Sequence, residues 1–208
     1  MSHSPEYPFH KVWFRRNVDW NRFTRIYIAP VNNEHLLKAI DNNSAEYKSL
    51  KKDAEELGYF TQRNFVEAFT NDPAHRYRLV TVPGPGALIL EIALTEMSPH
   101  EVALEAATYA GGPAVGVVGW LGGGLIRSSI KDAIAFEARL RSGDTGEVIA
   151  MFADREAGKQ TIINVRGLSR YGYAKAVIDE WAKQFVRVLN KKPGEQIPDS
   201  EPFDLKLW

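Results

Sequence analysis

The chain has no cysteine among its 208 residues. This absence excludes disulfide bridges, thiolate metal sites and a cysteine nucleophile. An excess of one charge is also lacking, because 26 Lys and Arg residues balance 26 Asp and Glu residues. A chain without net charge has no general attraction for nucleic acid or for an anionic membrane surface. We therefore expect no nucleic-acid partner.

Motifs for catalysis and cofactor binding are lacking too. The histidines are His3, His10, His35, His75 and His100, and no two of them have the HxxxH or HExxH spacing of a helical metal site. There is no G-x-S-x-G elbow, and the glycine-rich stretch lacks the Gly-Lys-Ser/Thr ending of a phosphate-binding loop. We therefore predict a non-enzymatic protein with no catalytic residues, no cofactor and no metal site.

The tripeptide Asp144-Thr145-Gly146 also occurs in aspartic proteases, where the aspartate pairs with a second carboxylate. Here it follows Arg141-Ser142-Gly143 and precedes Glu147, which is a hydrated context. No second Asp-Thr/Ser-Gly is present, so only a homodimer could supply the partner. Two glycines beside an aspartate are typical of a turn, and we interpret Asp144 as a turn residue.

What the chain does contain is one long β-hairpin, predicted for Ala133 to Lys159. Period-two alternation over this length indicates antiparallel strands with one buried face. In the first arm, the face predicted to be buried carries Ile134, Phe136, Ala138 and Leu140, and the other face carries Glu137, Arg139 and Arg141. In the second arm, Val148, Ala150 and Phe152 alternate with Glu147, Ile149 and Met151. Asp154, Arg155, Glu156 and Lys159 close the hairpin as edge-strand charges or, alternatively, as the lining of a cleft.

The remaining periodicities predict further strands at residues 25–31, 77–82 and 87–97, with a turn at 83–86. They predict one helical turn within 32–44 and long helices at 45–71 and 173–189. The fold class is therefore α+β: a single domain with a mainly antiparallel mixed sheet and two principal helices packed on it. We place an aromatic and basic arm at 1–24, the domain at 25–190 and a C-terminal extension at 191–208. We expect the arm to pack its aromatic side chains onto the domain: Trp13, Phe14, Trp20 and Phe23.

A glycine-rich insertion at about 106–126 is the unusual part of the chain, since it carries no charge. It contains two pairs of glycines at the small-xxx-small spacing that allows close helix contact. One interpretation is a loop between sheet strands, and the other is a surface for self-association or membrane contact. The candidate interaction residues are Gly112, Val115, Gly116, Val117, Gly119, Trp120 and Gly123.

Three stretches taken together resemble a known family: residues 77–97, 135–159 and 173–189, with RIYIAPV upstream of them. They are similar to the bacterial predicted lipoproteins grouped as domain of unknown function 3313. The resemblance implies an export signal, a lipid-modified cysteine and a place in the periplasm, attached to a membrane such as the outer membrane. Neither signal nor cysteine is present here, and we expect either a cytosolic protein or a mature form. The family has no established activity.

Three hypotheses about function remain open. The first is a non-enzymatic cell-envelope lipoprotein domain that binds a protein partner or itself. The second is a periplasmic domain that binds a small ligand or a cell-wall fragment near the glycine-rich segment. The third is a hydrolase with dispersed catalytic residues. A flat apolar patch would favour the first, and a deep pocket with convergent ionisable groups would favour the other two.

Overall fold

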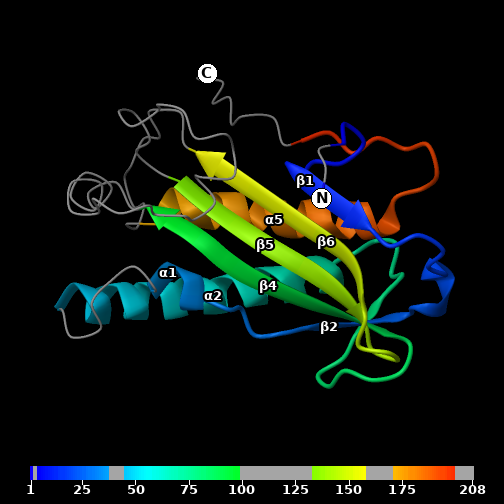
Figure 1. Ribbon diagram of the computed structural model, residues 1–208, viewed down its shortest axis with the longest axis horizontal. Coiled ribbons are helices and arrows are strands. Elements are labelled where there is room, and N and C mark those ends of the chain that lie inside the picture. The colour runs from blue at the N-terminus through cyan, green and yellow to red at the C-terminus, as the bar shows by residue number, and fades with distance from the viewer. Residues whose placement is uncertain (2–3, 38–44, 99–132, 158–170, 200–208) are drawn as a thin grey trace.

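The computed structural model describes residues 1, 4–37, 45–98, 133–157 and 171–199. These residues form a single α+β domain with a mixed sheet, as the sequence predicted (Figure 1). The elements in chain order are β1 (Lys11–Phe14), the short 3-10 helix η1 (Trp20–Arg22), β2 (Arg25–Ile28), α1 (Glu34–Leu37), α2 (Ala45–Thr70), β3 (Arg78–Leu79), β4 (Ala87–Ser98), β5 (Ala133–Ser142), β6 (Val148–Ala157) and α5 (Gly172–Asn190).

The sheet has the strand order β1-β6-β5-β4-β2-β3. Neighbouring strands run antiparallel from β1 to β4, whereas β2 lies parallel to both β4 and β3. The β5–β6 hairpin therefore lies inside the sheet, with β1 along its outer side. The edge of the sheet beyond the hairpin is thus built from the beginning of the chain, where Lys11 lies opposite Ala153.

Helices α2 and α5 cover one face of the sheet (Figure 1), and a cluster of phenylalanines fills the space between the layers. The ring centroid of Phe185 in α5 lies 5.7 Å from that of Phe136, 4.9 Å from that of Phe152 and 5.3 Å from that of Phe65 in α2. Phe9, which precedes β1, lies 4.7 Å from the same ring and is fully buried. The N-terminal arm is thus part of the core.

The predicted facing is confirmed for the first arm of the hairpin, where Ile134, Phe136, Ala138 and Leu140 are all buried. On the second arm Ala150 and Phe152 are buried as predicted, but Val148 is only half-buried. Ile149 was assigned to the outward face and is 3% exposed, because the register shifts between Leu140 and Arg141.

The interpretation as an edge-strand charge is wrong for Asp154, which is buried next to the last residue pair of β1 and β6, Lys11 and Ala153. Arg155 and Glu156 lie beyond that pairing, and Lys159 lies outside the described residues. Asp154 lies two residues beyond Phe152, so it points to the same core side, and it is 3% exposed.

Both long helices are confirmed. The apolar stripe of α2 is buried at Ala54, Leu57, Phe65 and Phe69. Gly58 in its middle has a packing reason, because a Cβ there would lie 2.3 Å from Nδ2 of Asn33. No helix in the described part of the chain has the length and apolar character that crossing a bilayer requires.

Three expectations about strands and burial need correction. The arm at 1–24 contributes the strand β1, which the sequence did not predict. Trp13 in that strand was expected to pack onto the domain, but it is 37% exposed because it points to the face without α2 and α5. The strand expected at residues 77–82 is only two residues long.

Two turns meet at the start of β4 and the end of β5 and fix the position of the hairpin loop. The N–H of Gly143 donates to the carbonyl of Ala87 at 2.8 Å, and the N–H of Gly86 donates to Oδ1 of Asp144 at 3.1 Å. Nη2 of Arg22 lies 3.0 Å from Oδ2 of the same aspartate. Asp144 therefore lies in the hairpin turn, where its carboxylate holds the neighbouring turn in place.

Candidate functional site

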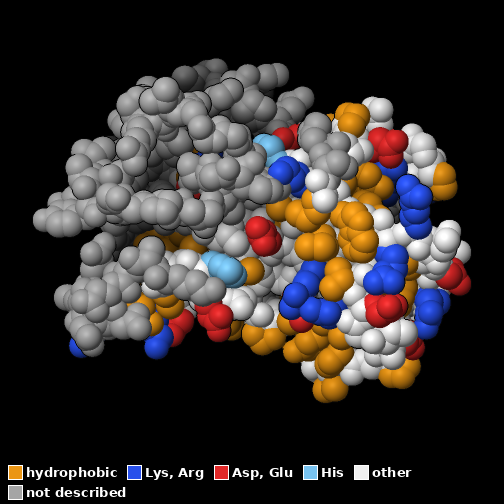
Figure 2. Space-filling model, in the orientation of Figure 1, with side chains coloured by type: hydrophobic (Ala, Val, Ile, Leu, Met, Phe, Trp, Pro, Cys, Tyr) orange, Lys and Arg blue, Asp and Glu red, His pale blue; other side chains and the backbone are white. Residues whose placement is uncertain are grey.

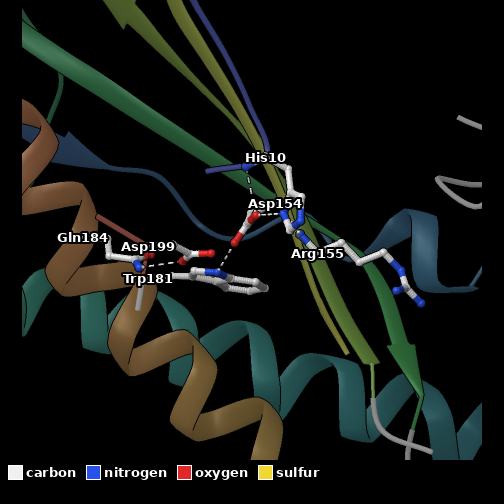
Figure 3. Close-up of polar contacts among 6 residues, drawn as sticks. All are labelled: His10, Asp154, Arg155, Trp181, Gln184 and Asp199. Atoms are coloured by element: carbon white, nitrogen blue, oxygen red, sulfur yellow. Dashed lines mark hydrogen bonds and ion pairs between the residues drawn. The ribbon is translucent and has the colours of Figure 1, made fainter. Parts of the chain in front are cut away.

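A buried carboxylate joins three segments that lie far apart in the sequence (Figure 3). The side chain of Asp154 in β6 is 1% exposed. Its Oδ1 accepts the backbone N–H of His10 at 3.1 Å and contacts Nδ1 of the same residue. Its Oδ2 accepts Nε1–H of Trp181 in α5 at 2.7 Å. We call His10, Asp154 and Trp181 the polar node.

The node is stable because each partner compensates for burial of the charge. A carboxylate taken out of water is costly unless it is hydrogen-bonded. Here the backbone N–H of His10 and Nε1–H of Trp181 donate to it, and the ring of His10 contacts it. The hydrogen bond to Asp154 raises the pKa of His10 above its ordinary value, although partial burial lowers it. The imidazolium form therefore persists to a higher pH than in a free histidine.

Further acidic groups surround the node. Burial, followed by the charges of Asp154 and Asp199, raises the pKa of Glu156 to about 7, and His10 and Arg155 act in the opposite direction. Nε2 of Gln184 in α5 donates to Oδ1 of Asp199 at 3.4 Å. The carboxyl group of Glu156 therefore loses its proton near neutral pH.

Arg155, next to the node, belongs to the other side of the sheet (Figure 3). Its Nε and Nη2 donate to the two carboxylate oxygens of Glu96 in β4 at 2.7 and 2.9 Å. A bidentate pair of this kind is both strong and directional. It connects β6 to β4 across the intervening strand, and the charge at the end of the hairpin is thus paired within the sheet.

The chemistry open to the polar node is that of an aspartate that orients a histidine. Such a pair also supplies the general base of many hydrolases. In this fold the second carboxylate oxygen is bound to Trp181, and the first also holds the backbone of the arm. These contacts attach β1 and α5 to β6, which is a structural role. Among the described residues, no group of three or more His, Asp or Glu side chains is placed to hold a metal ion.

The second candidate feature is the exposed face of the sheet, opposite α2 and α5. The register places Trp13, Met151, Arg139 and Glu91 side by side across β1, β6, β5 and β4. The adjacent row is Lys11, Ala153, Glu137 and Ala93. Figure 2 shows hydrophobic, basic and acidic side chains mixed over the described part of this face.

Two arginines on this face pair with one glutamate of the sheet. Nε of Arg139 contacts Oε2 of Glu91, and Nε of Arg141 donates to the same oxygen at 2.9 Å. Burial raises the pKa of Glu91, but the hydrogen bonds from the two arginines outweigh it and the pKa lies below its ordinary value. The apolar end of the face, at Trp13 and Met151, is 37% and 38% exposed.

The candidate interaction segment predicted from the sequence, with Trp120 and its neighbouring glycines, lies outside the described residues. Of His10, His35 and His75, the histidines within the described residues, only His10 takes part in the polar node. Sequence reasoning missed the polar node, although one signal was present: Asp154 continues the inward positions of Ala150 and Phe152. Its donors, His10 and Trp181, carry no sequence signal that links them to it.

Comparison with solved structures finds weak overall similarity. The PelC dodecamer from Paraburkholderia phytofirmans is 7% identical, with a TM-score of 0.41, over 84% of this chain and 96% of that one. A single-substitution variant of PelC from the same organism is 10% identical, with the same TM-score, over 84% and 95%. Similarity at this level indicates neither a shared function nor a shared quaternary structure.

No curated protein matches the chain. The model of one protein family matches residues 3–185, which include the arm, the whole sheet and most of α5. That family has no assigned activity. The chain belongs to the family described as Protein of unknown function (DUF3313).

Proposed function

We propose that this protein is a non-catalytic lipoprotein domain of the bacterial cell envelope that binds a second copy of itself through the exposed face of its sheet. The observation that carries the proposal is the Trp13–Met151 pair. Two large apolar side chains from strands far apart in the sequence lie opposite each other on that face. Both are more than one-third exposed. Trp, Met and Arg are enriched in protein interfaces, and all three occur in this one row.

A second copy fits this face because its charges are self-complementary. Arg139 and Glu137 are the exposed charges of β5, and they lie in adjacent rows. A two-fold contact presents the same patch from both partners, so each basic group can face an acidic one. Strand β1 adds an edge that pairs only with β6 among the described strands. Trp13 and Met151 would form the apolar centre of such an interface.

The envelope location rests on the family resemblance, which implies an exported and lipid-modified precursor. Producing the protein from its native gene and separating periplasm, membranes and cytosol would test this part. We expect the protein in the membrane fraction and labelled by radioactive palmitate. Recovery in the cytosol without label would contradict the envelope assignment and leave the interface proposal to its own test.

Sedimentation velocity over a range of concentrations tests the interface. The wild type should self-associate, and Trp13→Ser combined with Met151→Ser should raise the dissociation constant at least about tenfold. Val82→Ser with Tyr59→Ser is the matched control, because these side chains are 72% and 69% exposed elsewhere on the surface. Circular dichroism should be unchanged in both variants.

Two results would contradict the proposed interface. One is a wild type that stays monomeric at every concentration tested. The other is association that survives the Trp13 and Met151 changes but is lost in Trp120→Ser combined with Val117→Ser. That second result would assign self-association to the glycine-rich segment in place of the sheet face.

A further inference from the structure

A cavity of about 360 Å³ lies where the N-terminal arm, η1 and the end of α5 meet. This volume is at the lower end of the range for small-molecule sites. Three aromatic side chains line it: Tyr7 of the arm, Phe14 of β1 and Trp20 of η1. The ring centroids of Tyr7 and Phe14 are 5.1 Å apart, and those of Phe14 and Trp20 are 5.9 Å apart. The wall therefore includes a continuous, half-buried aromatic surface.

The charged groups that line the cavity are all basic. They are Arg76, which precedes β3, and Lys191 and Lys192, which follow α5. No carboxylate is found among the described lining residues. Glu6 lies 3.3 Å from Nζ of Lys191 and offsets only one of the three charges.

The two more buried cations are held in fixed positions. Nη1 of Arg76 donates to the carbonyl of Leu189 at 2.8 Å, at the C-terminal end of α5. Nζ of Lys191 lies 5.2 Å from the ring centroid of Tyr7, and its side chain is 10% exposed. Lys192 is exposed, and no ion pair engages its side chain within the described residues. The cavity thus combines an aromatic wall with preorganised positive charge and one available lysine.

We propose that this cavity binds a small acidic saccharide, meaning a sugar ring that carries one carboxylate or one phosphate. The apolar C–H face of a sugar ring can pack on Phe14 and Trp20, while the anionic group bonds to the lysines. Charge-assisted hydrogen bonds of this kind are stronger than neutral ones. A neutral apolar ligand would leave the cations unused, and a cationic ligand would be repelled. The proposal is independent of self-association, because its residues are not those of the exposed face.

Matched pairs of sugars, followed by saturation-transfer NMR and calorimetry, test the proposal. N-acetylmuramic acid differs from N-acetylglucosamine by a lactyl group that carries a carboxylate, and glucose 6-phosphate differs from glucose by its phosphate. We expect at least one acidic sugar to bind about tenfold more tightly than the neutral sugar of its pair. Binding of N-acetylmuramic acid alone indicates a cell-wall fragment as the ligand, and binding of glucose 6-phosphate alone indicates a sugar phosphate. Either result supports the site.

Variants then place the binding in this cavity. Lys192→Gln should weaken binding of the acidic sugar about fivefold to tenfold. Because Lys192 is exposed, this change should leave the fold intact. Lys51→Gln is the control, since that lysine lies on α2 and its side chain is 53% exposed. Trp20→Leu should reduce saturation transfer to the ring protons, provided that circular dichroism confirms folding.

The proposal is overturned if no acidic sugar binds at roughly 10 mM, the weak limit for such a site. It is equally overturned if each neutral sugar binds as tightly as the acidic sugar of its pair. Equal weakening of binding by Lys51→Gln and Lys192→Gln would also overturn it. The Trp13 and Met151 variant should bind the acidic sugar like the wild type. Failure of the sugar site and failure of the proposed interface are therefore distinguishable.

Discussion

Replacing Asp154 by asparagine tests the polar node with almost no change in shape. In the wild type, the carboxylate of Asp154 accepts the backbone N–H of His10, contacts the ring of His10 and accepts Nε1–H of Trp181. An amide has only one acceptor oxygen, and its NH2 group can only donate. In either orientation the NH2 group faces a donor, and the favourable charge beside His10 is lost.

The magnitude follows from these contacts. Leaving one buried donor unsatisfied costs about 1–3 kcal/mol, and hydrogen bonds to a charged group lie in the upper part of that range. We therefore expect Asp154→Asn to lower the free energy of unfolding by about 2–4 kcal/mol. In a domain of this length each kcal/mol shifts the melting temperature by roughly 2–4 °C. The expected decrease is thus roughly 5–15 °C.

Urea denaturation followed by circular dichroism measures the loss. Glu137→Gln is the matched control, because it makes the same chemical change on the exposed side of β5 and should alter stability by no more than about 0.5 kcal/mol. Trp181→Phe removes the other donor and should be destabilising by itself. In a double-mutant cycle the two core changes should show a coupling of at least about 1 kcal/mol. A loss for Asp154→Asn no larger than that of the control, or strictly additive effects, would refute the node as a stabilising unit.

Three further predictions concern the hairpin, pH and a turn. Phe136→Ala should cost about 3–5 kcal/mol and Glu137→Ala about 0.5 kcal/mol in chemical denaturation, and equal losses would refute the facing of β5. The pKa of Glu156 is raised from 4.5 to about 7, so the folded chain keeps a proton that the unfolded chain releases in this range. Stability should therefore fall as pH rises from 4.5 through 7, by about 1–2 kcal/mol once solvent screening is allowed for. The raised pKa of His10 acts in the same direction, since its contribution is lost as pH rises through the folded value. The melting temperature should depend less steeply on pH over this range in Glu156→Gln than in the wild type. An equally steep dependence in the variant would contradict the role of Glu156. Gly143→Ala would place a Cβ 2.3 Å from the carbonyl oxygen of Gly84 and should cost about 1–3 kcal/mol. Gly84→Ala, which has open space, should cost far less in the same thermal assay.

Elements whose signal is local could be predicted from the sequence. The β5–β6 hairpin and helices α2 and α5 follow from side-chain periodicity. The alternation of buried and exposed residues is clear in the second half of β5, whereas residues 133–136 are buried on both faces. The inward position of Asp154 follows from the same period, once β6 is known to be an interior strand. The sequence could not show that β6 is an interior strand, because its neighbour β1 is only four residues long and begins far away in the chain, at Lys11.

The parts that could not be predicted depend on partners that are distant in the sequence. His10 and Asp154 are 144 residues apart, and no pattern within either segment names the other. Trp13 illustrates the same limit, because a tryptophan in a β-rich run is expected to be buried, yet its strand presents it to solvent. The basic cavity is likewise assembled from the arm, η1, the segment before β3 and the end of α5. Only the tertiary structure brings these four segments together.

The pairing of β1 with β6 has a consequence for how the chain folds while it is being synthesised. The ribosome makes Lys11–Phe14 early, but the strand that receives it is made only after most of the chain has emerged. Closing so long a loop is slow, because the entropy must be lost before the contacts form. Until then the aromatic arm has no core to enter, and the outer edge of the new hairpin is uncovered. A nascent chain stalled before Val148 should therefore leave its N-terminal arm open to proteases and chaperones, whereas release of the full chain should protect it.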